Sequence, residues 1–430
     1  MNKSLLLCTA LLLSPGLRAT EAAMNQSLAV WQQRMAEYAA AVDQAATPEA
    51  KTAVALPDGR DVAPALWQSI AGKTGTRTEE YKVKKETRKR TVDTYEFEQA
   101  WAAPAVVWML NHPEAFASVF RGKSKSVSFF SNALLTSLEN VHYSSPAAAD
   151  ICAALAGSPG AREYAILQKI YLRNTDKEAR ACAALAMSLM LNSQLLAGVE
   201  GSEALARSKR VYYLKQALLL SQEDTMFGTA PLSSIVEQQT YYLRYLAPGS
   251  IPPQVKLKDA DGKEAVFPQP GKVTLFFFWS PDEDSGAEIM NNRDKLEQQY
   301  PGLELVPVMP FSTPEVVQQL SESGISTYMD NEKGAAGQAY RIASVPSVLL
   351  VGKTSTVLYN GIPDIGLQTA LDTALQKEKA AATSARPKVT IKAEEPVIQP
   401  GSVAKPSPKK ADAIPQDTDT PPALREMPEF

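Results

Sequence analysis

The hydrophobic pattern of the chain changes near residue 250, and this change most constrains what the chain can fold into. From about residue 22 to residue 247, apolar residues recur at intervals of three and four, which is the spacing of packed α-helices. Residues 254–376 instead alternate between short apolar runs and amphipathic segments, which predicts strands separated by helices around one sheet. The sequence therefore predicts a multidomain chain with two different kinds of core.

The first region predicts an irregular all-α domain over residues 23–249. Its clearest helix begins in NTDKEARACAALAMSLML, where Thr175 and Glu178 stand in the capping-box relation. Further segments with the same periodicity are SPAAADICAALAG, AREYAILQKIYLRN and SEALARSKRVYYLKQALLL. The short turns between them favour antiparallel helix pairs.

The second region predicts an α/β domain over residues 250–379. The run VTLFFFW at 273–279 is apolar throughout, as a central strand buried on both faces requires. Further strands are predicted at 303–309, 347–351 and 356–360, and helices at 281–300, 313–323 and 366–376. Their order, with a parallel first pair and an antiparallel last pair, predicts a mixed central sheet flanked by helices.

Two segments of this region resemble the TlpA-like thiol:disulfide interchange redoxins, a family of exported bacterial proteins with a thioredoxin fold. IPPQVKLKDADGKEAVFPQPGKVTLFFFW is similar to the entry hairpin and first central strand of that family. TYMDNEKGAAGQAYRIASVPSVLLV is similar to its second half, including the pair Val345 and Pro346. The resemblance covers nearly all of residues 254–376 and implies a thioredoxin-like domain. It also implies that the bond before Pro346 is cis and faces the family's active site.

The sequence departs from the family at the position of the reactive cysteine pair. Members carry Cys-X-X-Cys at the start of the first helix, where the helix dipole stabilises a thiolate. In FWSPDEDSGAE, aligned through Phe278 and Trp279, Glu283 and Gly286 occupy the cysteine positions. Residues 250–379 contain no cysteine, so this domain has no thiolate for dithiol exchange. We therefore predict no catalytic residue, no cofactor and no enzymatic activity.

The segment SPDEDSG instead has the composition of a helix start. Ser280 suits the N-cap, Pro281 suits the first helical position, and Glu283 completes a Ser-X-X-Glu box. Adjacent acidic residues would complement the positive end of the helix dipole. Three acids in a row could alternatively bind a divalent cation, and Glu283 could act as a base. The cap is the favoured interpretation, and no metal site is predicted.

A peptide-binding groove follows from the resemblance, because in the redoxins this surface receives an extended peptide through main-chain contacts that need no cysteine. Its predicted residues are Trp279, Ser280, Pro281, Asp282, Val345 and Pro346. This predicts a peptide- or protein-binding or scaffolding module of the cell envelope. One rival is an enzyme that uses Cys152 and Cys182 or the acidic loop. Another is a structural envelope component that interacts through its tail.

The amino terminus predicts a signal peptide over residues 1–22. Lys3 precedes an apolar run, and small residues suited to cleavage follow at Ala19 and Ala22. An exported bacterial protein, periplasmic or secreted, is expected. Cleavage leaves Cys152 and Cys182, which would either form a disulfide in an oxidising compartment or pack as free thiols.

Charge and composition exclude several partner classes. The net charge of -3 provides no general attraction to nucleic acid, and glutamates flank the basic run KVKKETRKR. The apolar runs are shorter than the roughly 20 residues that a membrane-spanning helix needs. Residues 380–430 are rich in proline and lysine with no apolar period, which predicts a disordered tail.

Overall fold

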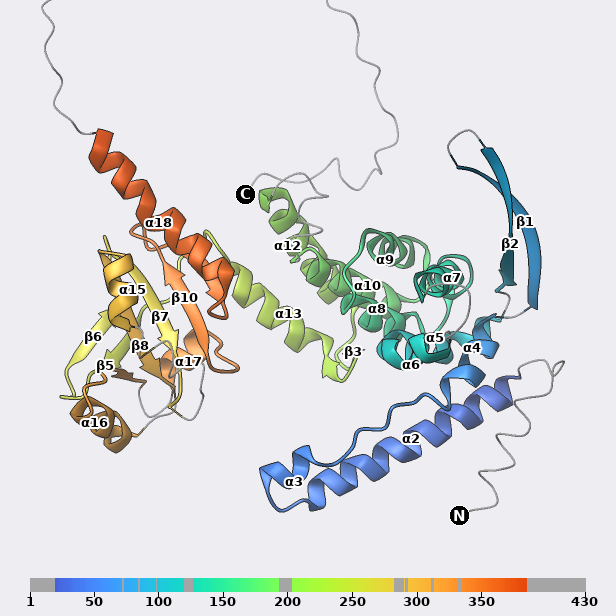
Figure 1. Cartoon of the computed structure of the whole chain (residues 1–430), viewed down its shortest axis with the longest axis horizontal. Helices are drawn as coiled ribbons and strands as arrows, with labels where there is room; N and C mark the ends of the chain where they lie inside the picture. The colour runs from blue at the N-terminus through green and yellow to red at the C-terminus, as the bar shows by residue number, and fades with distance from the viewer. Residues whose placement is uncertain are drawn as a thin grey trace, which may run out of the picture. The chain divides into compact units, whose positions relative to one another are not determined.

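The computed structural model describes residues 20–71, 73–83, 86–97, 99–119, 127–192, 203–281, 290, 293–310, 313–330 and 334–384 (Figure 1). The chain up to Glu378 forms one compact unit. Most of the predicted signal peptide and of the predicted disordered tail lies outside the described residues. The predicted domain boundaries at residues 22, 249 and 379 stay predictions.

Helices dominate the first region, as the apolar spacing predicted. Those described are α2 (Glu21–Gln44), α3 (Pro48–Thr52), α4 (Ala63–Ala71), α5 (Ala103–Asn111), α6 (Pro113–Val119), α7 (Val127–Asn140), α8 (Ala148–Ala156), α9 (Ala161–Arg173), α10 (Lys177–Met190), α12 (Glu203–Leu220) and α13 (Leu232–Tyr241). Helix α10 contacts α8, α9 and α12, and it buries almost every residue from Ala179 to Met190 (Figure 1). Its many alanines allow neighbouring helices to approach from several sides, so α10 is the centre of this core.

The start of α10 differs from the prediction by one residue. The N-cap is Asp176, whose carboxylate accepts hydrogen bonds from the N–H groups of Glu178 and Ala179, both at 3.2 Å. The predicted capping box of Thr175 and Glu178 is therefore wrong. A carboxylate both caps the free N–H groups and complements the helix dipole, which favours Asp over Thr at this position.

A long β-hairpin interrupts the helical region, a local feature that the prediction of a helical domain did not include. Strands β1 (Lys73–Val83) and β2 (Glu86–Glu96) pair antiparallel from Lys73 opposite Glu96 to Val83 opposite Glu86. Threonines alternate with other residues along the first strand, and β-branched residues favour extended backbone. The basic run lies at the closed end of this hairpin, where Lys89 pairs with Glu80 at 3.2 Å.

The second region forms a seven-stranded mixed sheet, in the order β11-β10-β7-β8-β9-β5-β6. Its strands are β5 (Val255–Lys258), β6 (Glu264–Phe267), β7 (Val273–Phe278), β8 (Leu303–Met309), β9 (Tyr328–Met329), β10 (Ser347–Val351) and β11 (Val357–Gly361). Strands β7, β8 and β9 run parallel, whereas β10 is antiparallel to both β7 and β11. Together with the helices between these strands, this order gives a thioredoxin-like fold and confirms the predicted fold class.

Two apolar layers cover the faces of this sheet. Phe276 and Phe278 point into one layer with Leu246 and Tyr340, and Leu275 and Phe277 point into the other. The second layer is closed by α18 (Ile365–Ser384), which extends further than the helix predicted to end at residue 376 (Figure 1). The other described helices of this domain are α15 (Arg293–Gln299), α16 (Pro314–Glu322) and α17 (Ala335–Ala339).

A single π-helical turn, η3 (Tyr242–Leu246), follows α13 and packs on the first of these layers. The hydroxyl of Tyr241 donates a hydrogen bond of 2.9 Å to the carbonyl of Ala339. Within the described part of the chain, each helix is too short or too polar to cross a membrane.

Candidate functional site

The loop before β10 carries the pair on which the resemblance rests. The Val345–Pro346 bond is cis, as the resemblance implied. Ser347 pairs with Phe278, so this loop lies beside the carboxyl end of β7, where Trp279, Ser280 and Pro281 follow. The fold therefore brings the two halves of the predicted groove to the same edge of the sheet.

The described groove residues differ in how much surface they offer. Val345, Pro346 and Ser280 are half-buried, and Pro281 is exposed. Trp279 is only 2% exposed, and its indole Nε1 donates a hydrogen bond of 3.3 Å to the hydroxyl of Thr327. Trp279 therefore belongs to the core of the domain and offers almost no surface to a ligand.

The acidic segment after Pro281 cannot be compared with its predicted role. Asp282, Glu283 and Gly286 lie outside the described residues, so the predicted helix cap stays a prediction. Among the side chains with a described position, no group of three His, Cys, Asp or Glu could hold a metal ion.

The backbone of Val345 distinguishes the loop from its surroundings. Within the described ranges, no hydrogen bond involves the N–H or the carbonyl group of Val345. The next residue but one, Ser347, uses its hydroxyl to donate a 2.7 Å hydrogen bond to the carbonyl of Ser344. Val345 thus presents a donor and an acceptor on a half-buried residue in the loop before β10, where an extended chain could pair with them.

The two cysteines of the helical region are buried free thiols, so the structure has the second of the two predicted alternatives and not the disulfide. The Cys182 thiol donates to the carbonyl of Met226 at 3.4 Å, and the Cys152 thiol donates to that of Ala179 at 3.9 Å. Burial raises the pKa of Cys182 to about 12 and raises the pKa of Cys152 well above its usual value. Neither thiol forms a thiolate readily near neutral pH, which disfavours nucleophilic chemistry at this pair.

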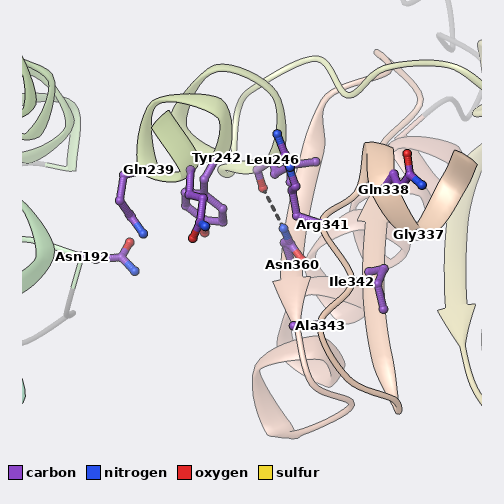
Figure 2. A pocket seen from close by; sticks show the side chains of 11 residues that line it. Asn192, Gln239, Tyr242, Leu246, Gly337, Gln338, Arg341, Ile342, Ala343 and Asn360 are labelled. Atoms are coloured by element: carbon purple, nitrogen blue, oxygen red, sulfur yellow. Dashed lines mark hydrogen bonds between the residues drawn. The ribbon is translucent and has the colours of Figure 1, made fainter. Parts of the chain in front are cut away.

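A cavity that sequence reasoning missed lies between the helical region and the thioredoxin-like domain (Figure 2). Its volume is ≈ 670 Å³, within the usual range for small-molecule sites of about 300 to 1,000 Å³. The described lining residues are Asn192, Gln238, Gln239, Tyr242, Leu246, Gly337, Gln338, Arg341, Ile342, Ala343 and Asn360. No sequence motif connects these positions, because only the packing of η3 on the sheet brings them together.

Comparisons with known proteins add a set of solved structures. No family model matches the chain, and no curated protein matches it. The thioredoxin domain of a thiol-disulfide oxidoreductase from Bacteroides vulgatus is 17% identical, with a TM-score of 0.28, and the match covers 30% of this chain and 99% of that one. A putative thiol:disulfide interchange protein DsbE from Chlorobium tepidum is 19% identical, with a TM-score of 0.27, covering 30% and 99%. A putative thioredoxin from Neisseria meningitidis is 28% identical, with a TM-score of 0.26, covering 31% and 95%.

These names correct one of our predictions. Several of the matched structures are called thiol-disulfide oxidoreductases or putative ones, and thiol-disulfide oxidoreductases are enzymes. The prediction that this chain has no enzymatic activity is therefore contradicted, and we withdraw it. The thioredoxin-like fold itself rests on the strand order described above.

Proposed function

We propose that this protein is an exported member of the TlpA-like redoxins whose thioredoxin-like domain binds an extended segment of a peptide or protein beside Val345 and Pro346. The observation that carries the proposal is the backbone of Val345, whose N–H and carbonyl groups have no hydrogen-bond partner within the described ranges. An extended chain can satisfy such a pair of groups through main-chain hydrogen bonds of its own. The half-buried side chains of Val345 and Pro346 would contact the same segment.

Binding at this loop is noncovalent. The domain contains no cysteine, so no mixed disulfide can form there with a bound thiol. Such binding is compatible with a catalytic role elsewhere in the chain. The signal-like composition of residues 1–22 supports a periplasmic or secreted location.

Fluorescence anisotropy with the full chain tests the loop. The probe is a labelled, reduced and carboxymethylated polypeptide, which is extended and cannot react with thiols. Val345→Asp should weaken binding at least 10-fold, because it places a charge where an apolar segment is expected to pack. Ile365→Asp is the matched control, since Ile365 is 81% exposed in the same domain but lies at the start of α18. Equal affinities in the two variants, with unchanged melting temperatures, would contradict the assignment of binding to the Val345 loop.

An insulin-reduction assay separates this function from thiol-disulfide exchange. The full chain is compared with a variant in which Cys152 and Cys182 are both serine. We expect no turnover that depends on these thiols, because burial raises the pKa of both. Turnover that disappears in the double variant would assign the function to the helical region instead.

A further inference from the structure

A buried arginine holds two of the side chains that line the cavity and meets no carboxylate among the described residues. Arg210, on α12, is only 5% exposed. Its Nη1 donates to Oδ1 of Asn192 at 2.7 Å, and its Nη2 donates to Oε1 of Gln239 at 3.1 Å. Its Nε is buried without a hydrogen-bond partner within the described part of the chain. A full positive charge therefore sits behind two amide side chains that line the cavity.

Arg210 fixes the direction of these two amides. A guanidinium group has donors and no acceptor, so Asn192 and Gln239 must turn their oxygen atoms toward it. Each amide keeps its NH₂ group for the cavity that it lines. Asn360 is fixed in the opposite sense, because its Nδ2 donates to the carbonyl of Leu246 at 3.2 Å and its oxygen remains an acceptor (Figure 2).

A second cation lies in the cavity wall itself. Arg341 is exposed, and its guanidinium stacks over the ring of Tyr241 at 4.5 Å from the centroid. Among the residues described, no hydrogen bond or ion pair holds this guanidinium, so its donors are available to a ligand. No aspartate or glutamate stands among the described lining residues. The cavity is therefore positive and rich in donors.

The remaining wall is apolar. Leu246, Ile342 and Ala343 line it together with Tyr242. A ligand that satisfies both parts of the cavity carries an anionic group at one end and an apolar body at the other. The flat guanidinium and amide donors match the two oxygens of a carboxylate in one plane better than the tetrahedral oxygens of a phosphate.

We propose that this cavity binds an organic carboxylate with an apolar body, either a small free acid or the carboxyl terminus of a peptide that ends in an apolar residue. The carboxylate accepts hydrogen bonds from the amide groups of Asn192 and Gln239, Arg341 contributes positive charge from the far side of Tyr242, and the apolar body packs on Leu246 and Ile342 (Figure 2). Arg210 is a positioning residue, because it orients two of the donors without reaching the ligand. The cavity wall includes Ala343, two residues before Val345, but the two sites use different groups and are tested by different variants, so each can fail without the other.

Isothermal titration calorimetry on the full chain tests the ligand class. N-acetyl-leucine and the tripeptide Gly-Ala-Leu provide a free carboxylate on a small acid and on a peptide, and their carboxyl amides are the neutral counterparts. We expect both acids to bind in the micromolar to millimolar range and both amides to bind at least 10-fold more weakly. A clear preference for the tripeptide would identify a peptide terminus as the source. Equal binding of acid and amide, no binding of either acid, or tighter binding of inorganic phosphate would overturn the proposal.

Two variants test the site. Gln239→Glu keeps an oxygen for Arg210 but replaces the donor NH₂ with a negative charge, and Arg341→Gln removes the cation. Each should weaken N-acetyl-leucine at least 10-fold. Arg244→Gln is the matched control, because Arg244 also stacks over a tyrosine, Tyr245 at 5.1 Å, but does not line the cavity. Unchanged affinity in both site variants, or the same loss in Arg244→Gln, would contradict the assignment. The circular dichroism melting curve of each variant shows that it folds.

Discussion

The helical region and the thioredoxin-like domain differ in how they satisfy buried polar side chains. In the thioredoxin-like domain, the fully buried carboxylate of Asp330 accepts hydrogen bonds from the N–H groups of Ala336 and Gly337, both at 2.8 Å. Thr274, also fully buried, donates to Glu304 at 3.0 Å. In the helical region, by contrast, Nδ1 of His142 and Nε of Arg210 are buried without a partner within the described residues.

The difference follows from where each architecture leaves its backbone groups. A helix satisfies its interior N–H groups within itself, so a side-chain acceptor buried among helices finds few free N–H groups, whereas buried hydroxyls such as those of Ser69 and Ser137 donate to helix carbonyls. A sheet domain has many loops and helix ends near its core, and their N–H groups can serve a buried side chain. We therefore expect buried polar groups to cost the most stability in the helical region. A change of pH or the binding of a ligand at those groups should change that stability.

The largest expected effect is at Asp330. Asp330→Ala leaves two N–H groups buried at the start of α17 without their acceptor, which should lower the free energy of unfolding by about 3 kcal/mol. Urea unfolding followed by circular dichroism measures the loss. Asp259→Ala is the control, because Asp259 also accepts from two backbone N–H groups, those of Asp261 and Lys263, but is only half-buried. Equal losses in the two variants would break the comparison, since burial would then not matter.

The next effect is a pH dependence that comes from His142. Burial lowers the pKa of His142 to about 4, whereas an unfolded histidine titrates at about 6.5. The unfolded state therefore binds the proton more readily, and stability falls as the pH drops below about 6.5 until it levels near 4. Between pH 7 and pH 5 the loss from this group should be about 2 kcal/mol.

Urea unfolding at pH 7 and pH 5 checks this expectation. His142→Leu should lose about 2 kcal/mol less than the natural protein over this interval, because the leucine does not titrate. If the natural protein and His142→Leu lose the same amount, the histidine is not the source of the pH dependence.

The smallest expected effect concerns an ion pair that joins α7 to α9. Arg162 donates from Nε and Nη2 to the two oxygens of Glu139, at 2.9 and 2.8 Å, and this pairing lowers the pKa of Glu139. Arg162→Lys keeps the charge but loses the two-pronged contact, which should cost about 1 kcal/mol.

The matched change in the sheet domain is Lys272→Arg, at the pair formed by Lys272 and Glu304 at 2.7 Å. It should alter stability by less than about 0.5 kcal/mol, because a single-point contact on an exposed lysine contributes little. Chemical unfolding of both variants gives the comparison. A loss in Lys272→Arg as large as that in Arg162→Lys would show that the geometry of the pair is unimportant here.

The positions of the main strands of the thioredoxin-like domain could be predicted from the sequence. Strand β8 begins and ends at the predicted residues, and β7 lacks only the last predicted one. Both could be predicted because a short run of mostly apolar residues indicates a buried strand. The hairpin of β1 and β2 was missed because its threonines and charged residues form no apolar stripe against a core. The N-cap of α10 was misplaced because Thr175 and Asp176 are both good capping residues.

The amino-acid sequence by itself determined that this protein has a helical region followed by a thioredoxin-like domain, and that the domain has no thiol. The helical region and the alternation of strands and helices follow from local periodicity, the absence of a thiol follows from composition, and the thioredoxin-like fold was implied by the family resemblance. Only the tertiary structure decided that Trp279 is buried near the Val345 loop, that the cysteines are free, and that Arg210 directs two amides toward a cavity. These features depend on which side chains meet once the chain has folded, and residues far apart along the chain meet only through packing.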